Sequence, residues 1–143
     1  MRLIVISLFL IPLIASAKDP RIDCHQLAIT QTDLTVCSGS KLKDADDELN
    51  RVYQAIRSKY AKNPEFLRKL KSAQLAWIKF RDAEMDALFP VDDPYYYGSV
   101  KPMCQADWLR KITEQRIIEL KRWLEPIEEG DMCGGSIGHY DYE

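Results

Sequence analysis

The chain has 143 residues, with 20 basic and 22 acidic side chains and a formal net charge of −2. This length is enough for one domain with a single hydrophobic core. The slightly acidic balance gives no support to nucleic-acid binding and would modestly favour a basic partner.

The first 17 residues have the organisation of a secretory signal peptide. Arg2 precedes an apolar run over residues 3–14, and Ala15-Ser16-Ala17 supplies the small residues of a cleavage site. The apolar run is shorter than the ~20 residues of a membrane-spanning helix, so a retained anchor is the weaker interpretation. We therefore predict a periplasmic or secreted protein that has no membrane association after residues 1–17 are removed.

Four cysteines lie in the predicted mature chain: Cys24, Cys37, Cys104 and Cys133. An even number of cysteines in an exported protein favours two disulfides, and four cysteines allow three connectivities. Zinc binding is the competing interpretation, but it requires closer ligand pairs, and no Cys-x-x-Cys motif occurs. We expect neither a metal nor a cofactor.

The first predicted helix covers residues 30–62. Thr30 and Asp33 are spaced to form a capping box at its start, in a variant with Asp in place of Glu. Apolar residues then recur every three to four positions. The Ser-Gly-Ser sequence at residues 38–40 interrupts this pattern and indicates a kink, or a short helix followed by a longer one, because an interior glycine costs about 1 kcal/mol relative to alanine.

Two further helices follow. Asn63-Pro64 favours a new helix start, and the apolar pattern continues to Leu88. Residues 90–102 contain three prolines and three consecutive tyrosines, which predict a long loop. The third helix begins between residues 103 and 107 and stops before Pro126. The expected fold is all-α, an antiparallel three-helix bundle with disulfide-tethered ends.

This organisation divides the chain into three parts. Residues 1–17 are the signal peptide, residues 18–125 the helical domain, and residues 126–143 an acidic, Gly-rich tail that Cys133 would hold in place.

Several polar residues occupy positions on the expected helix seam. Gln74 and Arg81 are seven residues apart on the apolar stripe of the second helix. Because an unpaired buried charge is costly, we expect such residues to form one hydrogen-bonded network that fixes the register of the helices. The proposed members are Asp46, Asn50, Gln74, Arg81, Asp82 and Arg116. The functional alternative is a site for a small anion between Arg81 and Arg116.

The loop between the second and third helices combines acids with aromatic residues: Asp92, Asp93, Tyr95, Tyr96 and Tyr97. Tyrosines beside acids in a Pro-bounded loop are typical of a binding surface. The structural alternative, which we weigh equally, is that one or two of these tyrosines pack over the end of the bundle.

Catalysis has little support in the sequence. The two histidines, His25 and His139, lie in the leader and in the tail, without a serine or cysteine at motif spacing. No P-loop, His-Glu-x-x-His or dinucleotide-binding glycine motif is present. We expect a binding protein and not an enzyme.

Three motifs occur in order along the helices, with a Gly-Ser loop before the last. They are Asp46-x-x-Leu49-Asn50-x-x-Tyr53, Gln74-x-x-Trp77-x-x-x-Arg81-Asp82, and Thr113-x-x-Arg116-x-x-x-Leu120 preceded by Gly98-Ser99-x-x-Pro102-Met103. Over residues 24–124 the chain resembles the N-terminal helical domain of the lysozyme-inhibitor LprI-like family. The resemblance implies a cell-envelope binding module whose partner is a lysozyme or another peptidoglycan hydrolase, inhibited by steric blocking.

The resemblance also bears on the cysteines. Met85 and Trp108 stand where members of the family usually carry cysteines, and the loss of both suggests that these two are bonded to each other in relatives. This chain carries Cys104 and Cys133 instead. The comparison implies the pairs Cys24–Cys37 and Cys104–Cys133, with crossed pairings as the alternative.

Overall fold

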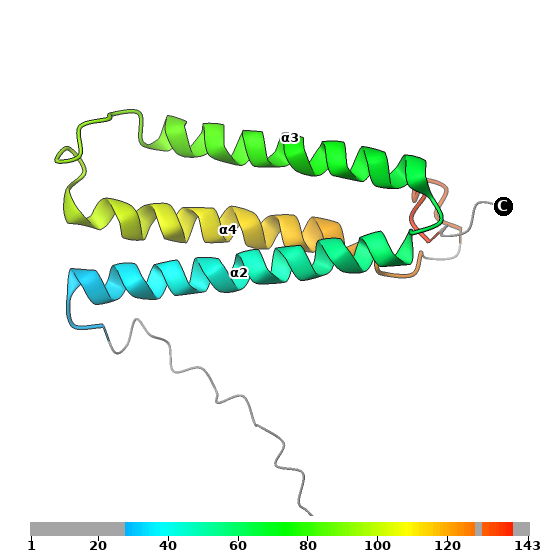
Figure 1. Ribbon diagram of the computed structural model, residues 1–143, viewed down its shortest axis with the longest axis horizontal. Helices are drawn as coiled ribbons and strands as arrows, with labels where there is room; N and C mark the ends of the chain where they lie inside the picture. Colours follow the sequence, from blue (N-terminus) through cyan, green and yellow to red (C-terminus); the bar gives the residue numbers. More distant parts are fainter. Residues whose placement is uncertain (1–27, 128–129, 139–143) are drawn as a thin grey trace, which may run out of the picture.

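The protein is described by a computed structural model that covers residues 28–127 and 130–138, and these residues contain helices and no strands. The helices are α2 (Gln31–Lys59), α3 (Pro64–Leu88) and α4 (Lys101–Lys121), with a short 3-10 helix η1 (Gly98–Val100) leading into α4 (Figure 1). The predicted all-α fold with three helices is confirmed. The predicted signal peptide and both histidines lie outside the described residues. No described helix is both long enough and apolar enough to cross a membrane.

The start of α2 is fixed by the predicted capping box. The Thr30 hydroxyl accepts a hydrogen bond from the Asp33 backbone N–H at 3.1 Å, and the Asp33 carboxylate accepts one from the Thr30 N–H at 2.9 Å. The helix then continues without a break through residues 38–40, so the predicted division into two helices is wrong. Cys37 is buried on the inner face of this stretch, and its packing outweighs the low helix propensity of the glycine between the two serines.

The other two helices differ in how well their ends were predicted. The Asn63 side chain accepts a hydrogen bond from the Phe66 N–H at 2.9 Å and caps α3, which ends at Leu88 as expected. The start of α4 is Lys101, before the predicted 103–107, because Pro102 lies in the first turn, where its missing N–H removes no helical hydrogen bond. Its last residue is Lys121, earlier than the predicted stop at Pro126.

Helices α2 and α4 lie side by side and run in the same direction (Figure 1). Near their starts, the Gln31 amide contacts the Met103 sulfur at 3.7 Å. Further along, Lys121 Nζ forms an ion pair with Glu48 at 2.9 Å. The sequence positions of these partners increase together, as they must when two helices are parallel.

Helix α3 runs in the opposite direction to both (Figure 1). Phe66 at its start packs on Trp123 just beyond the end of α4, with ring centroids 4.8 Å apart. Gln74, two turns later, bonds to Arg116, which lies earlier in α4. The chain thus passes up, down and up again through the bundle.

The hydrophobic core is concentrated along the α2–α4 seam and at the α2–α3 turn. Its buried members are Leu49, Val52, Ile56, Tyr60, Leu70, Ile117 and Leu120. Among the residues of α3, Leu70 alone is buried, and the large side chains Leu75, Phe80 and Leu88 are exposed. The bundle is therefore a tight parallel pair, with α3 held against it mainly through its first half.

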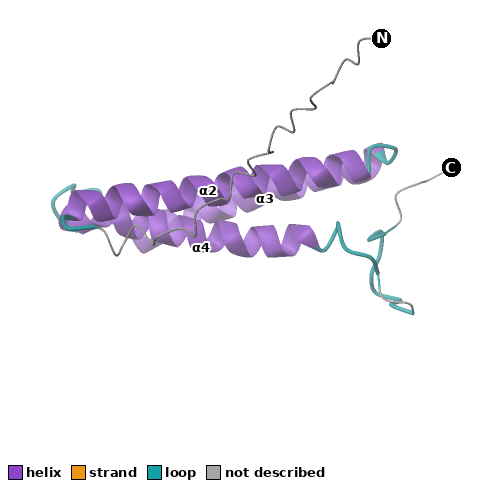
Figure 2. Cartoon of the chain, turned by 90° about the horizontal axis from the view of Figure 1, so that it is seen from below, coloured by secondary structure: helices purple, strands orange, loops and turns teal. Residues whose placement is uncertain are grey.

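The predicted Cys104–Cys133 disulfide is wrong, because both of these cysteines are free thiols. Cys104 lies in the first turn of α4, whereas the tail leaves the opposite end of that helix (Figure 2). A helix of 21 residues is about 30 Å long, and a disulfide requires Cα atoms within about 7 Å. Cys37 is disulfide-bonded. Its expected partner, Cys24, lies outside the described residues, so the Cys24–Cys37 pairing stays a prediction.

The unequal packing of the helices predicts unequal effects of truncation. Ile56→Ala should lower the free energy of unfolding by about 2–5 kcal/mol, because Ile56 is fully buried in the α2–α4 seam. Leu75→Ala should change it by no more than about 0.5 kcal/mol, since Leu75 is half exposed on α3. Urea denaturation of both variants measures the difference, and equal losses would contradict the described packing.

The ion pair between α2 and α4 predicts a pH dependence. Hydrogen bonds from Lys121 and then Arg51 hold the pKa of Glu48 below its ordinary value. A carboxyl group with a lowered folded-state pKa contributes stability above its unfolded pKa and loses it as the pH falls through the folded value. Glu48→Gln should therefore be less stable than the wild type at neutral pH, and the difference should shrink as the pH falls through the folded-state pKa of Glu48.

Urea denaturation across this pH range measures the effect, with Asp86→Asn on the exposed face of α3 as the matched control. A Glu48→Gln difference that stays constant with pH would show that the Glu48 carboxylate does not contribute through its charge.

Candidate functional site

The loop between α3 and η1 is anchored by one of its three tyrosines. The Tyr97 hydroxyl accepts a hydrogen bond from the Val91 N–H at 3.3 Å, and its ring packs edge-on against Phe89 at 5.2 Å. Lys101 Nζ lies 5.0 Å from the centre of the Tyr97 ring. Tyr97 therefore packs over the end of the bundle, as the structural alternative for the tyrosines predicts.

The other two tyrosines face solvent. The side chains of Tyr95 and Tyr96 are 88% and 67% exposed. Asp93 shapes the turn beneath them, since its carboxylate accepts from the Tyr95 N–H at 2.9 Å and its carbonyl from the Tyr96 N–H at 3.2 Å. Gly98 closes the turn with a positive φ of 65°, which an L side chain would strain. The loop thus presents two aromatic rings beside exposed Asp92 and Asp93.

Part of the predicted polar network assembles around Trp77. Arg116 Nε donates to the Gln74 side-chain oxygen at 3.1 Å. The guanidinium carbons of Arg81 and Arg116 lie 5.4 Å and 5.9 Å from the centre of the Trp77 ring. Arg81 also forms an ion pair with its neighbour Asp82 at 2.8 Å. One indole therefore connects two arginines that have different polar partners.

Helix α2 contributes no side chain to the polar cluster around Trp77. In the described part of the chain, neither Asp46 nor Asn50 forms a hydrogen bond or ion pair with Gln74 or with either arginine. The face of α2 that packs on α4 carries Ala45 and Leu49, which leaves Asn50 exposed. The expected six-residue network is therefore replaced by two smaller polar pairs on α3 and α4.

A cleft that the sequence analysis missed lies between the first half of α3 and the end of α4. It has a volume of about 810 Å³, and Phe66, Leu70, Ala73 and Trp123 supply apolar atoms to its lining. Arg116 also lines it. Burial lowers the pKa of the Arg116 guanidinium, and the charge of Glu119 partly opposes this effect. In the sequence, the spacing of residues 66, 70 and 73 places them on one helix face, and this pattern could have indicated the apolar wall of the cleft.

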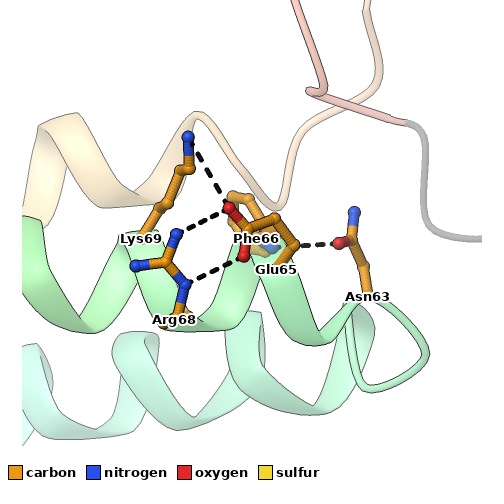
Figure 3. A network of polar contacts seen from close by, with 5 residues as sticks. All are labelled: Asn63, Glu65, Phe66, Arg68 and Lys69. Carbon is orange, nitrogen blue, oxygen red and sulfur yellow. Dashed lines mark hydrogen bonds and ion pairs between the residues drawn. The ribbon is translucent and has the colours of Figure 1, made fainter.

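The edge of the cleft carries charges of both signs (Figure 3). Glu65 accepts hydrogen bonds from Arg68 at 2.7 Å and 2.9 Å, and Lys69 lies 3.7 Å from the same carboxylate. The hydrogen bond from Arg68 is the main cause of a lowered pKa at Glu65. Glu65 is therefore ionised at neutral pH, and two exposed cations compensate its charge. Among the described residues no group of three or more His, Cys, Asp or Glu side chains is placed to hold a metal ion.

The exposure of the Arg81–Asp82 pair predicts a small effect of its removal. The two side chains are 23% and 57% exposed, so solvent screens their interaction. Arg81→Met should lower the free energy of unfolding by less than about 1 kcal/mol. Thermal and urea denaturation measure this, with Asp82→Asn as the matched variant. A loss of several kcal/mol on Arg81→Met alone would instead indicate a buried ionic network.

Comparison with known proteins shows which family this chain resembles. A family model described as lysozyme inhibitor LprI matches residues 24–120, which include α2, α3 and all of α4 but its last residue. The chain is also 33% identical over 126 residues to an uncharacterized protein of Rhizobium meliloti (strain 1021), covering 80% of this chain and 87% of that protein. No solved structure matches. The chain belongs to the lysozyme inhibitor LprI family.

Proposed function

We propose that this protein is an exported inhibitor that binds a lysozyme or a related peptidoglycan hydrolase and blocks its substrate cleft without turnover. Membership of the lysozyme inhibitor LprI family supports the inhibitory role. The export step rests on the signal-peptide pattern of residues 1–17.

The observation that carries the proposed mechanism is the outward position of Tyr95 and Tyr96. Exposed tyrosines on a fixed support are effective anchors, because they bury a large area on binding and lose little side-chain entropy. Here the support is fixed, since Tyr97 packs the loop against Phe89 and Lys101 at the ends of two helices, and Asp93 closes the turn within the loop. Asp92 and Asp93 add negative charge, which favours association with a basic enzyme.

A small anion held between Arg81 and Arg116 is the alternative function. Such a site would require both guanidinium groups to be available to the ligand. Arg81 already pairs with Asp82, and it does not line the cleft to which Arg116 contributes. The paired-arginine site is therefore the weaker proposal, and blocking by the tyrosine loop is preferred.

The proposal is tested by titrating lysozymes of several types with the purified, oxidised chain that begins at Lys18. Peptidoglycan hydrolysis by at least one type should fall to a low residual rate near stoichiometric inhibitor. Full activity of every type at large excess of the chain would contradict the proposed function.

Variants of the loop then test the mechanism. Tyr96→Ala should weaken inhibition by about tenfold or more, because truncation of an interface anchor typically costs 2 kcal/mol or more. Asp93→Asn removes the charge but keeps an acceptor for the Tyr95 N–H, whereas Asp93→Ala removes both. Asp93→Asn should therefore weaken inhibition less than Asp93→Ala.

The inhibition constant and the melting temperature are measured for each loop variant. The melting temperature should stay near that of the wild type for Tyr96→Ala, since this ring is mostly exposed. Leu75→Ala, on an exposed part of α3, is the control for binding. Unchanged inhibition by Tyr96→Ala and Tyr95→Ala would exclude the loop as the blocking element.

A further inference from the structure

The cleft is lined by residues from the start of α3 and the end of α4. These two helix ends meet at the end of the bundle opposite the loop that joins α3 to α4 (Figure 1). The apolar wall of the cleft is built from side chains that already contact one another. The Phe66 ring packs against Trp123 at 4.8 Å and against the buried Tyr60 at 4.3 Å. The wall is therefore preformed, and its volume of about 810 Å³ falls in the range of small-molecule sites.

Arg116 places a positive charge in this cleft with no carboxylate in direct contact, and the charge of Glu119 acts on it only from beyond ion-pair distance. Its Nε–H is satisfied by Gln74, a neutral amide, and its guanidinium carbon lies 5.9 Å from the centre of the Trp77 ring. In the described part of the chain no carboxylate lies within ion-pair distance of Arg116. A partly buried guanidinium that has lost hydration, and that no carboxylate contacts directly, favours the binding of an anion.

The remaining charges at the cleft do not cancel this preference. Glu65 opposes an anion, but Arg68 and Lys69 both contact its carboxylate. Lys69 itself lines the cleft, together with the uncharged Asn63 and Ser136. Among the described residues that line the cleft, Lys69 and Arg116 against Glu65 leave one net positive charge over an apolar wall.

We propose that this cleft binds a small amphiphilic carboxylate, with its aromatic or aliphatic body against Phe66, Leu70 and Trp123 and its carboxylate on Arg116. A purely apolar ligand would leave the Arg116 charge uncompensated. A small inorganic anion would leave the apolar wall in water. A molecule that carries both groups satisfies both parts of the cleft. This site is separate from the loop and does not depend on inhibition of a hydrolase.

The test is a titration of the isotope-labelled full mature chain with phenylbutyrate, followed by NMR chemical shifts. Saturable shifts are expected at the Trp123 indole N–H and at the backbone amides of residues 65–73. Acetate, which has the charged group alone, should produce none at the same concentration. Phenylbutanol, the uncharged analogue, should bind at least tenfold more weakly, as expected from loss of a charge-assisted hydrogen bond.

Two pairs of variants locate the site. Ala73→Phe fills the cleft from an exposed position and should abolish the shifts, whereas Ala76→Phe adds the same ring outside the cleft and should retain them. Arg116→Gln should weaken binding by tenfold or more, and Arg116→Lys should restore part of it. Equal binding by Ala73→Phe and Ala76→Phe, both folded by their spectra, would overturn the proposal. Equal affinity for phenylbutanol and phenylbutyrate would overturn the role of Arg116.

Discussion

The parallel pairing of α2 with α4 is the constraint on which the rest of the structure depends. Because both helices run in the same direction, α3 has to carry the chain back along the length of the pair (Figure 1). The tyrosine loop is therefore placed at one end of the bundle, and the α2–α3 turn, the cleft and the tail at the other. The two proposed sites are separated by the length of a helix, so each can be altered without the other.

The sequence predicted the helices well where local chemistry decides them. Thr30 with Asp33, and Asn63 alone, accept hydrogen bonds from free N–H groups at helix starts, and Pro64 has no N–H to satisfy; these signals are visible in a few residues. The prediction failed at residues 38–40, where burial of the neighbouring Cys37 against the rest of the bundle outweighs the propensity of the glycine. That contribution depends on tertiary packing, which the local pattern does not contain.

The candidate sites were predicted less completely, for the same reason. The tyrosine loop was identified from composition, but the sequence could not show that Tyr97 turns inward while Tyr95 and Tyr96 face solvent. The cleft depends on how α3 meets α4, and residues 66 and 123 are far apart in the chain. The incorrect Cys104–Cys133 pairing ignored the length of α4, which separates the two thiols.

The central claim is that the loop end of the bundle occupies the cleft of a hydrolase. The most direct measurement is the amide hydrogen-exchange footprint of the mature chain, free and in complex with a lysozyme that it inhibits. Exchange should slow at the amides of residues 91–98 and stay unchanged at those of residues 65–73, at the far end of the bundle. Protection confined to residues 65–73, with the loop amides unaffected, would contradict the central claim.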